Sequence, residues 1–301
     1  MRHLPAGLRL PLAAILIGSS TVLHVLPLFA VALIKAMLPF AAVRLASNPL
    51  LTGIAESWIA VNSRMIDLFT RTRFVVVGDT GLRRDGHYLV LANHQSWVDI
   101  PVLQKVFNRR IPLLRFFLKS QLFWIPLMGL AWWALDFPFM KRYTREQVER
   151  RPELAGRDIA STRRACEKFR SIPVSVMNFV EGTRFTAAKH AAQHSPYRHL
   201  LKPKSGGVAF VIDAMGEGLQ SILDVTIVYP QGRPTMLDLF GDKVAEVHLE
   251  VRERPIPQEF VGGDYQGDAA FRERFQAWMS TLWYEKDAAI GRIAGGARQA
   301  V

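Results

Sequence analysis

The stretch from His87 to Asp99 reads HYLVLANHQSWVD and decides how the chain folds around it. Its first part, His87–Ala92, is mostly aliphatic and aromatic, which is typical of a short buried β-strand. A polar block, Asn93–Asp99, follows without a break. Because catalytic side chains often stand at the ends of strands in α/β folds, this junction is the first candidate site.

Further apolar runs lie on both sides of this strand. The expected strands are Phe74–Val77, Arg115–Lys119, Phe137–Met140, Val174–Val180, Leu223–Tyr229 and Glu246–Arg252. The expected helices are Pro101–Phe107, Leu122–Trp133, Arg157–Arg170 and a long final helix that begins near Asp268. The glycines between Phe74–Val77 and His87–Ala92 indicate that a turn joins these two strands. The alternation predicts an α/β fold with a mixed, mostly parallel sheet flanked by helices.

The N-terminal region carries a long uncharged stretch, the 25 residues Leu10–Ile34. This length suffices to cross a hydrocarbon layer of about 30 Å. A single span, a hairpin that enters and leaves one leaflet, and a secretory signal peptide cleaved near Ala30–Ala32 all fit, and a water-soluble core helix is the bland alternative. Pro27 would break or kink a straight helix. We therefore favour a kinked or re-entrant arrangement that keeps Arg2 and Arg44 on the cytoplasmic side.

A second helix is expected over Leu51–Phe69, where apolar residues recur at helical spacing. We accordingly divide the chain into membrane-associated helices at residues 1–70 and one α/β domain at residues 71–301. The 301 residues are 50% hydrophobic, which allows a sizeable core. The formal net charge of +12 indicates an anionic partner, such as nucleic acid, an anionic lipid surface or an acidic carrier protein.

The segment Lys141–Arg170 is rich in both basic and acidic residues. It fits either a solvated helical face with i,i+4 ion pairs or a docking surface for membrane or carrier. Cys166, within this segment, is the single cysteine of the chain, so no intramolecular disulfide and no zinc ribbon can form. We interpret its side chain as a small buried hydrophobe, and we expect no metal site elsewhere.

His94 and Asp99 could act together as a general base and its supporting carboxylate. On one regular helix, five positions correspond to about 500° of rotation, so the two side chains would not share a face. They meet only if His94 lies in the turn before a helix that carries Asp99. Neutral imidazole can accept a proton near pH 7, and a carboxylate on its other nitrogen fixes the tautomer. The spacing of Ser96 and Asp99 also matches a capping box, so Asp99 could instead cap the helix.

A second block, Asn178–Arg184, reads NFVEGTR and again follows an expected strand. Together with Asn93–Asp99, it resembles the glycerolipid acyltransferase family, whose archetype is 1-acylglycerol-3-phosphate acyltransferase. That family carries an N-H-x-x-x-x-D block and an F-P-E-G-T-R block. Both are present here, with Val180 in place of the usual proline.

Weaker matches extend the resemblance over about Leu89–Pro230. The segments concerned are Lys119–Leu122 with the following Pro126 and Gly129, Phe139–Arg142, and Val225–Pro230. Within the family, the chain looks closest to bacterial inner-membrane acyltransferases with a basic insert. The resemblance therefore implies a catalytic domain that faces the cytoplasm at the inner membrane.

The resemblance implies an O-acyltransferase that moves a fatty acyl group from acyl-CoA or acyl-carrier protein to a lysophospholipid. The expected acceptor is 1-acylglycerol-3-phosphate, which would give phosphatidic acid; the alternative is another lysophospholipid such as lysophosphatidylglycerol. No cofactor is expected. A nucleic-acid-binding module would need a recognition signature that the sequence lacks, and a scaffold without catalysis is disfavoured by the intact His94–Asp99 pair.

The same resemblance assigns roles to individual residues. His94 is expected to be the general base and Asp99 to orient it. Lys119 is a candidate for neutralising the oxyanion of the tetrahedral intermediate. The residues expected to bind substrate are Arg142, Glu181, Gly182, Thr183 and Arg184. Among these, the two arginines would hold the acceptor phosphate, because guanidinium matches phosphate in a bidentate way. Glu181 would bind a glycerol hydroxyl or fix Arg184.

Overall fold

The computed structural model describes residues 1–38, 40–78, 81–140, 150, 169 and 172–299. A six-stranded sheet in the order β1-β8-β7-β2-β6-β3 runs through its middle. Its strands are β1 (Arg73–Val77), β2 (His87–Ala92), β3 (Leu114–Phe116), β6 (Val174–Phe179), β7 (Ser221–Val228) and β8 (Glu246–Arg254). Neighbouring strands are parallel except β7 and β8. The predicted mixed, mostly parallel sheet is thus confirmed.

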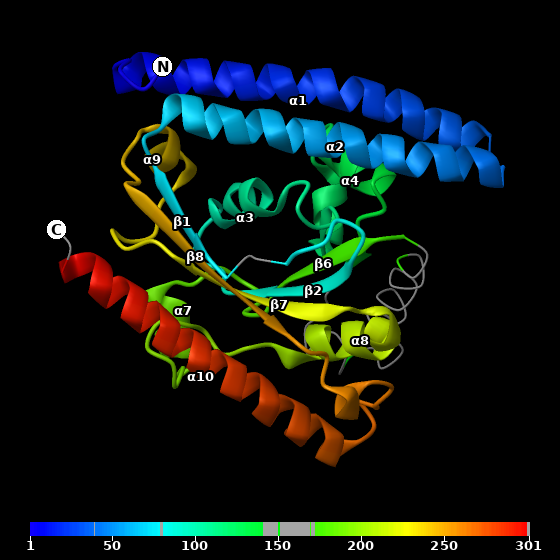
Figure 1. The fold of residues 1–301 in the computed structure, drawn as a ribbon, viewed down its shortest axis with the longest axis vertical. Helices are drawn as coiled ribbons and strands as arrows, with labels where there is room; N and C mark the ends of the chain where they lie inside the picture. Colours follow the sequence, from blue (N-terminus) through cyan, green and yellow to red (C-terminus); the bar gives the residue numbers. More distant parts are fainter. Residues whose placement is uncertain (39, 79–80, 141–149, 151–168, 170–171, 300–301) are drawn as a thin grey trace.

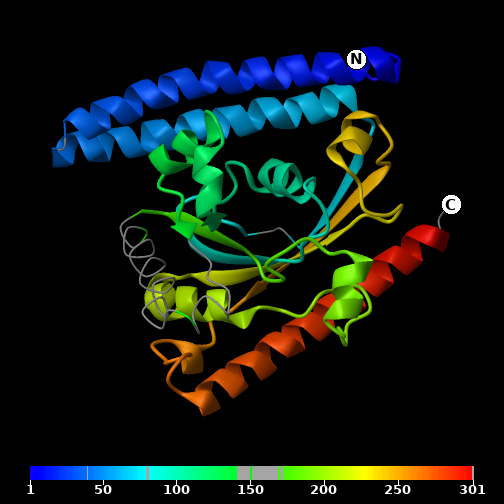
Figure 2. The same cartoon turned by 180° about the vertical axis from the view of Figure 1, so that it is seen from behind.

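Helices cover both faces of this sheet (Figures 1 and 2). On one face lie α3 (Asp99–Phe107), α4 (Met128–Ala134) and, outside them, the long helices α1 (Ala6–Met37) and α2 (Ala41–Phe69). On the other face lie α7 (Ala187–Ala192), α8 (Ser205–Met215) and α10 (Ala269–Gln299), and the short α9 (Met236–Phe240) connects β7 to β8. Each face buries its own hydrophobic cluster against the sheet, so side chains that alternate along one strand enter different cores.

The expected turn between the first two strands does not form a hairpin. β2 lies between β6 and β7, whereas β1 pairs in parallel with β8 at the edge of the sheet. Both predicted strands are present, and the connection between them leads from the edge of the sheet to its interior, because the parallel partners of each strand come from elsewhere in the chain.

The region after β3 is more broken than its apolar pattern suggested. The expected strand Arg115–Lys119 is divided between β3 and β4 (Leu118–Lys119), and β4 pairs with the short β5 (Phe139–Met140). The single helix predicted over Leu122–Trp133 is wrong: a 3-10 turn, η1 (Ser120–Trp124), and α4 replace it. Pro126 and the positive φ of 63° at Leu127 separate the two, because proline removes a backbone donor and favours an extended residue before it.

The two N-terminal helices form an antiparallel hairpin (Figure 1). The helix break expected as one effect of Pro27 does not occur, because α1 continues through Pro27 and the chain reverses between Met37 and Ala41. Packing against α2, with Val25 and Leu28 buried, outweighs the local cost of the proline. Residues at the two ends of α1 therefore lie far apart.

This correction separates the two arginines that were expected on one side. Arg2 donates to the backbone oxygen of Asp67, 2.9 Å away, near the end of α2. Arg44 lies in the first turn of α2, at the opposite end of the hairpin. α1 is long and apolar enough to cross a membrane, and most of it is exposed.

The division at residue 70 stays a prediction. α2 ends at Phe69 and β1 begins at Arg73, but the hairpin shares one hydrophobic cluster with the sheet. The predicted helix Arg157–Arg170, the side chain of Cys166 and most of the basic segment Lys141–Arg170 lie outside the described residues.

Candidate active site

The turn after β2 is anchored to the neighbouring strand β7 by Asn93. Its Oδ1 accepts the amide of Ile227 at 2.8 Å, and its Nδ2 donates to the Ile227 carbonyl at 2.9 Å. The side chain is fully buried, so the pair of hydrogen bonds acts where water cannot compete. The backbone that leads into His94 is therefore held at a fixed place at the end of the sheet.

His94 and Asp99 lie in the predicted loop–helix arrangement. His94 is in the turn, Asp99 is the first residue of α3, and His94 Nδ1 lies 2.8 Å from Asp99 Oδ2. The same oxygen accepts the backbone amides of Gln95 at 2.6 Å and Ser96 at 2.8 Å. The alternative role of Asp99 as a helix cap is not seen, because Val98 is the N-cap of α3 and no side chain caps this helix. The fully buried carboxylate instead holds the loop before α3 and the imidazole.

The ring of His94 is fixed on its flat side as well. It stacks on Phe179, the last residue of β6, with centroids 3.9 Å apart and planes 14° apart. Only 13% of the His94 side chain is exposed. The ring therefore has one orientation, set by Asp99 at its edge and Phe179 on its face.

Glu181 lies behind this turn. Its Oε1 accepts the amide of His94 at 2.9 Å, and its Oε2 accepts the amide of Leu201 at 3.0 Å. Burial raises the pKa of the Glu181 carboxyl to about 7, although the two backbone hydrogen bonds lower it. The structure therefore brings Glu181 to the backbone of His94, and its described hydrogen bonds do not include Arg184.

The rest of the second block reaches the open side of the turn. Gly182 has a φ of +68°, and a Cβ there would lie 2.9 Å from the side chain of Lys204, so glycine suits this sharp bend. Thr183 Oγ1 accepts Nζ of Lys189 at 2.7 Å. The guanidinium of Arg184 lies 4.4 Å from the ring centroid of Trp97, and both side chains are exposed.

A cavity of about 380 Å³ joins these residues. The predicted site residues that line it are His94, Lys119, Gly182, Thr183 and Arg184. Asp99 and Glu181 are buried behind its wall. Arg142 lies outside the described residues. The remaining wall is mainly apolar and includes Trp58, Ile100, Phe116, Leu118, Leu122, Met128, Trp132, Phe137 and Met177.

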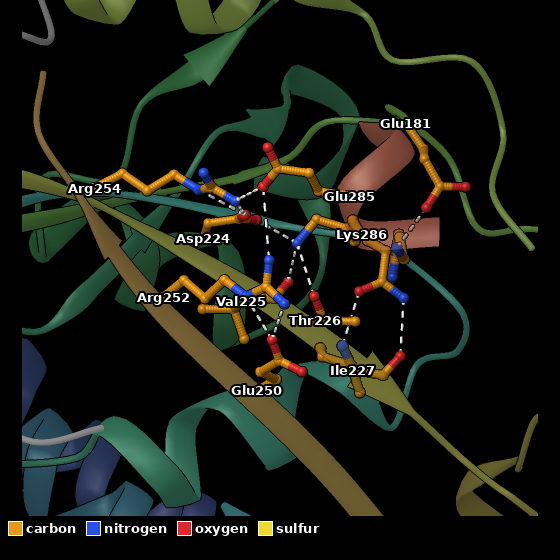
Figure 3. Close-up of polar contacts among 12 residues, drawn as sticks. Glu181, Asp224, Val225, Thr226, Ile227, Glu250, Arg252, Arg254, Glu285 and Lys286 are labelled. Atoms are coloured by element: carbon orange, nitrogen blue, oxygen red, sulfur yellow. Dashed lines mark hydrogen bonds and ion pairs between the residues drawn. The ribbon is translucent and has the colours of Figure 1, made fainter. Parts of the chain in front are cut away.

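A buried ionic cluster supports β7 from the other face of the sheet (Figure 3). Lys286 of α10 is fully buried; its Nζ lies 2.5 Å from Asp224 and donates to the Val225 carbonyl at 2.6 Å. Desolvation lowers the pKa of Lys286, and Asp224 opposes that shift. Arg254 of β8 lies 3.0 Å from the same Asp224.

Sequence reasoning missed several of these contributors. The Tyr229 hydroxyl donates a hydrogen bond to Asp99 Oδ1 at 2.7 Å. Lys286 donates to the backbone of β7, the strand that Tyr229 directly follows. In the sequence, Tyr229 stands out only as a member of the weakly matching segment Val225–Pro230. A tyrosine or lysine far along the chain gives no local sign of its partner, because the partner is set by strand order.

Comparison with known proteins gives the following matches. The family model described as "Acyltransferase" matches residues 73–230. Lysocardiolipin acyltransferase 1 of Gallus gallus is 25% identical over 261 residues, covering 81% of this chain and 64% of that protein. A probable 1-acyl-sn-glycerol-3-phosphate acyltransferase 5 of Arabidopsis thaliana is 28% identical over 215 residues, covering 67% of this chain and 54% of that protein.

Among solved structures, the 1-acyl-sn-glycerophosphate (LPA) acyltransferase PlsC from Thermotoga maritima aligns with a TM-score of 0.45 and 18% identity. That alignment covers 91% of this chain and 98% of the other. The alignments with the two curated relatives span 64% and 54% of their lengths.

Proposed function

The chain belongs to the acyltransferase family, and on this premise we propose that it moves a fatty acyl group from a thioester to a lysophospholipid hydroxyl. The observation that carries the proposal is the 2.8 Å contact between His94 Nδ1 and Asp99 at the wall of the cavity. With Nδ1 engaged, Nε2 is the ring nitrogen available to a substrate hydroxyl.

In the proposed reaction, the acceptor hydroxyl gives its proton to His94 as its oxygen attacks the thioester carbonyl. The new C–O bond forms, the C–S bond breaks, and His94 returns the proton to the departing thiolate. Asp99 stabilises the imidazolium that exists between these two transfers. Lys119, which lines the same cavity, is a candidate for balancing the negative charge on the carbonyl oxygen.

The acceptor would be held by its phosphate. Arg184 stands at the cavity, with its guanidinium over Trp97, and an exposed guanidinium can bind phosphate through two hydrogen bonds. We propose 1-acylglycerol-3-phosphate as acceptor and acyl-CoA or acyl-carrier protein as donor. Another lysophospholipid is the second candidate, because some relatives carry the name lysocardiolipin acyltransferase.

The apolar part of the cavity would take an acyl chain. Trp58, Met128 and Trp132 line both this cavity and a smaller apolar pocket that continues between the helical hairpin and α4. The smaller pocket lies under the inward face of the hairpin, where the buried Val25 and Leu28 line it. An acyl chain would fill this apolar space while its reacting end lies at His94.

The test of this function is an assay of the purified protein. Labelled acyl-CoA and acyl-carrier protein would each be offered with lysophosphatidic acid, lysophosphatidylglycerol and lysocardiolipin. We expect transfer to at least one of these acceptors, with lysophosphatidic acid preferred. Absence of any acylated product with all acceptors and both donors would refute the proposal.

Arg184→Ala should raise the KM for the phosphate-bearing acceptor by at least about 10- to 100-fold, because losing even one hydrogen bond to a charged group costs about 1.5–3 kcal/mol. The KM for the acyl donor should change much less. Arg198→Ala is the matched control, since Arg198 is exposed and is not among the cavity-lining residues. A loss confined to the donor's KM would assign Arg184 to the other substrate.

We further propose that the hairpin attaches the protein to the bacterial inner membrane with the catalytic domain in the cytoplasm. Exposed apolar side chains support this, and Ile15, Leu26 and Leu33 recur on one face of α1 with exposures of 63%, 61% and 60%. Replacing these three with aspartate should weaken binding to phospholipid vesicles by at least about 100-fold, because burying each side chain contributes about 1.5–3 kcal/mol.

Sedimentation with phosphatidylcholine–phosphatidylglycerol vesicles would measure this loss. The control replaces three exposed alanines of α10 with aspartate, namely Ala270, Ala277 and Ala288. Equal losses in the two triple variants would show that added negative charge, rather than the face of α1, governs attachment.

A further inference from the structure

Tyr229 follows β7 directly and reaches the site from behind. Its side chain is buried in the cluster that also contains Val225 and Ile227, so these three residues face the side of the sheet on which α3 lies. Its hydroxyl donates to Asp99 Oδ1 at 2.7 Å. Tyr229 thus contacts the catalytic pair at the one carboxylate oxygen that does not face His94.

The two oxygens of Asp99 have different partners. Oδ2 receives the imidazole and two backbone amides, whereas the described side-chain donor to Oδ1 is Tyr229. The χ2 torsion of aspartate, which rotates the carboxylate about the Cβ–Cγ bond, is only weakly restricted by itself. A hydroxyl on Oδ1 therefore fixes the plane of the group and keeps Oδ2 turned toward His94.

The hydroxyl is suited to this task because it keeps its proton. Burial raises the pKa of Tyr229 well above its usual value, and the neighbouring Asp99 carboxylate raises it further. The hydroxyl therefore keeps its proton and donates its hydrogen bond at neutral pH.

The backbone that carries Tyr229 is tied to the same turn as His94. Asn93 holds Ile227 through two hydrogen bonds, and Lys286 holds the Val225 carbonyl from the opposite face (Figure 3). These contacts form a closed ring. Hydrogen bonds join His94 to Asp99 and Asp99 to Tyr229, and the backbone of β7 leads to Ile227, which is bound to Asn93, the residue before His94. Movement of any member relative to the others would break a buried hydrogen bond.

We propose that Tyr229 is a positioning residue of the acyl-transfer reaction, which acts through Asp99 by fixing the orientation of its carboxylate. This inference rests on the proposed function. It predicts that removing the hydroxyl slows the chemical step without weakening substrate binding, because Tyr229 is not among the residues that line the cavity.

Tyr229→Phe should lower kcat by about 10- to 100-fold, the range for losing one hydrogen bond to a charged group. The KM values for donor and acceptor should stay within about twofold. Tyr88→Phe is the matched control: Tyr88 is a fully buried tyrosine on β2 whose hydroxyl accepts the amide of Arg83 at 2.9 Å. It should lose stability without losing kcat.

A double-mutant cycle separates positioning from general packing. In an Asp99→Asn background, Tyr229→Phe should cause no more than about a twofold further loss of kcat, because the carboxylate that it orients is gone. Equal losses in both backgrounds, or an unchanged kcat in Tyr229→Phe alone, would overturn the inference.

A spectroscopic readout tests Tyr229 independently of turnover. In histidine-labelled protein, the Nδ1–H proton of His94 should give a resonance that shifts in Tyr229→Phe and stays in place in Tyr88→Phe. An unmoved resonance in Tyr229→Phe would overturn the positioning role. Because no acceptor is needed, this outcome is distinct from a failure of the proposed function, which would appear as absent transfer by the wild-type protein.

Discussion

Replacing His94 with alanine is expected to lower kcat by about 10³- to 10⁴-fold while the protein remains folded. The substitution removes an imidazole that the structure places both against a buried carboxylate and at the cavity wall. Steady-state rates with a labelled acyl donor would measure the loss, and circular dichroism would check the fold. Wild-type turnover by folded His94→Ala would refute the general-base mechanism.

The chain offers a close control for this experiment. His248 of β8 is also partly buried and also contacts a carboxylate, with Nε2 at 2.8 Å from Glu246, but it is not among the residues that line the cavity. His248→Ala should leave kcat within about twofold of wild type. Asp99→Asn should be nearly as severe as His94→Ala, because the tautomer and the imidazolium both lose their support.

Asp224→Asn is expected to lower the free energy of unfolding by about 3–5 kcal/mol, since removing one partner of a buried ion pair leaves an uncompensated charge. The asparagine would face Lys286, which is fully buried, and Arg254. Urea unfolding in a mild detergent, followed by tryptophan fluorescence, would measure the change.

Two further variants test the stated cause. Adding Lys286→Met to Asp224→Asn should restore much of the lost stability, because the stranded charge is then removed. Glu285→Gln is the control: Glu285 also contacts Arg254, but its side chain is 41% exposed, so its loss should cost less than about 1 kcal/mol. A double variant as unstable as Asp224→Asn would show that packing, rather than charge, sets the cost.

The sequence predicted best those features that depend only on residues close together in the chain. The run His87–Ala92 matches β2 residue for residue, and the five-residue spacing of His94 and Asp99 was sufficient to place one in a turn and the other on a helix. A strand followed by a polar block can be recognised without knowing how the rest of the chain folds. The expected strand Val174–Val180, which leads into the second block, is likewise present as β6.

The features that sequence missed depend on residues brought together by the sheet. The position of β1 beside β8 and the support of Asp99 by Tyr229 follow from strand order. The burial of Lys286 follows from the packing of α10 on β7. The expectation of a helix break at Pro27 failed for a related reason. The local effect of proline on a helix can be predicted, but the packing of α1 against α2, which keeps α1 continuous, depends on the tertiary structure.

The pairing of β1 with β8 imposes an order of assembly. Arg73 and its partner Glu246 are 173 positions apart (246 minus 73), so at synthesis rates of about 5–20 residues per second the edge strand waits roughly 10–35 s for its neighbour. By then α1 and α2 have already been synthesised. Under the membrane attachment proposed above, the nascent chain meets the lipid surface first and completes its sheet afterwards.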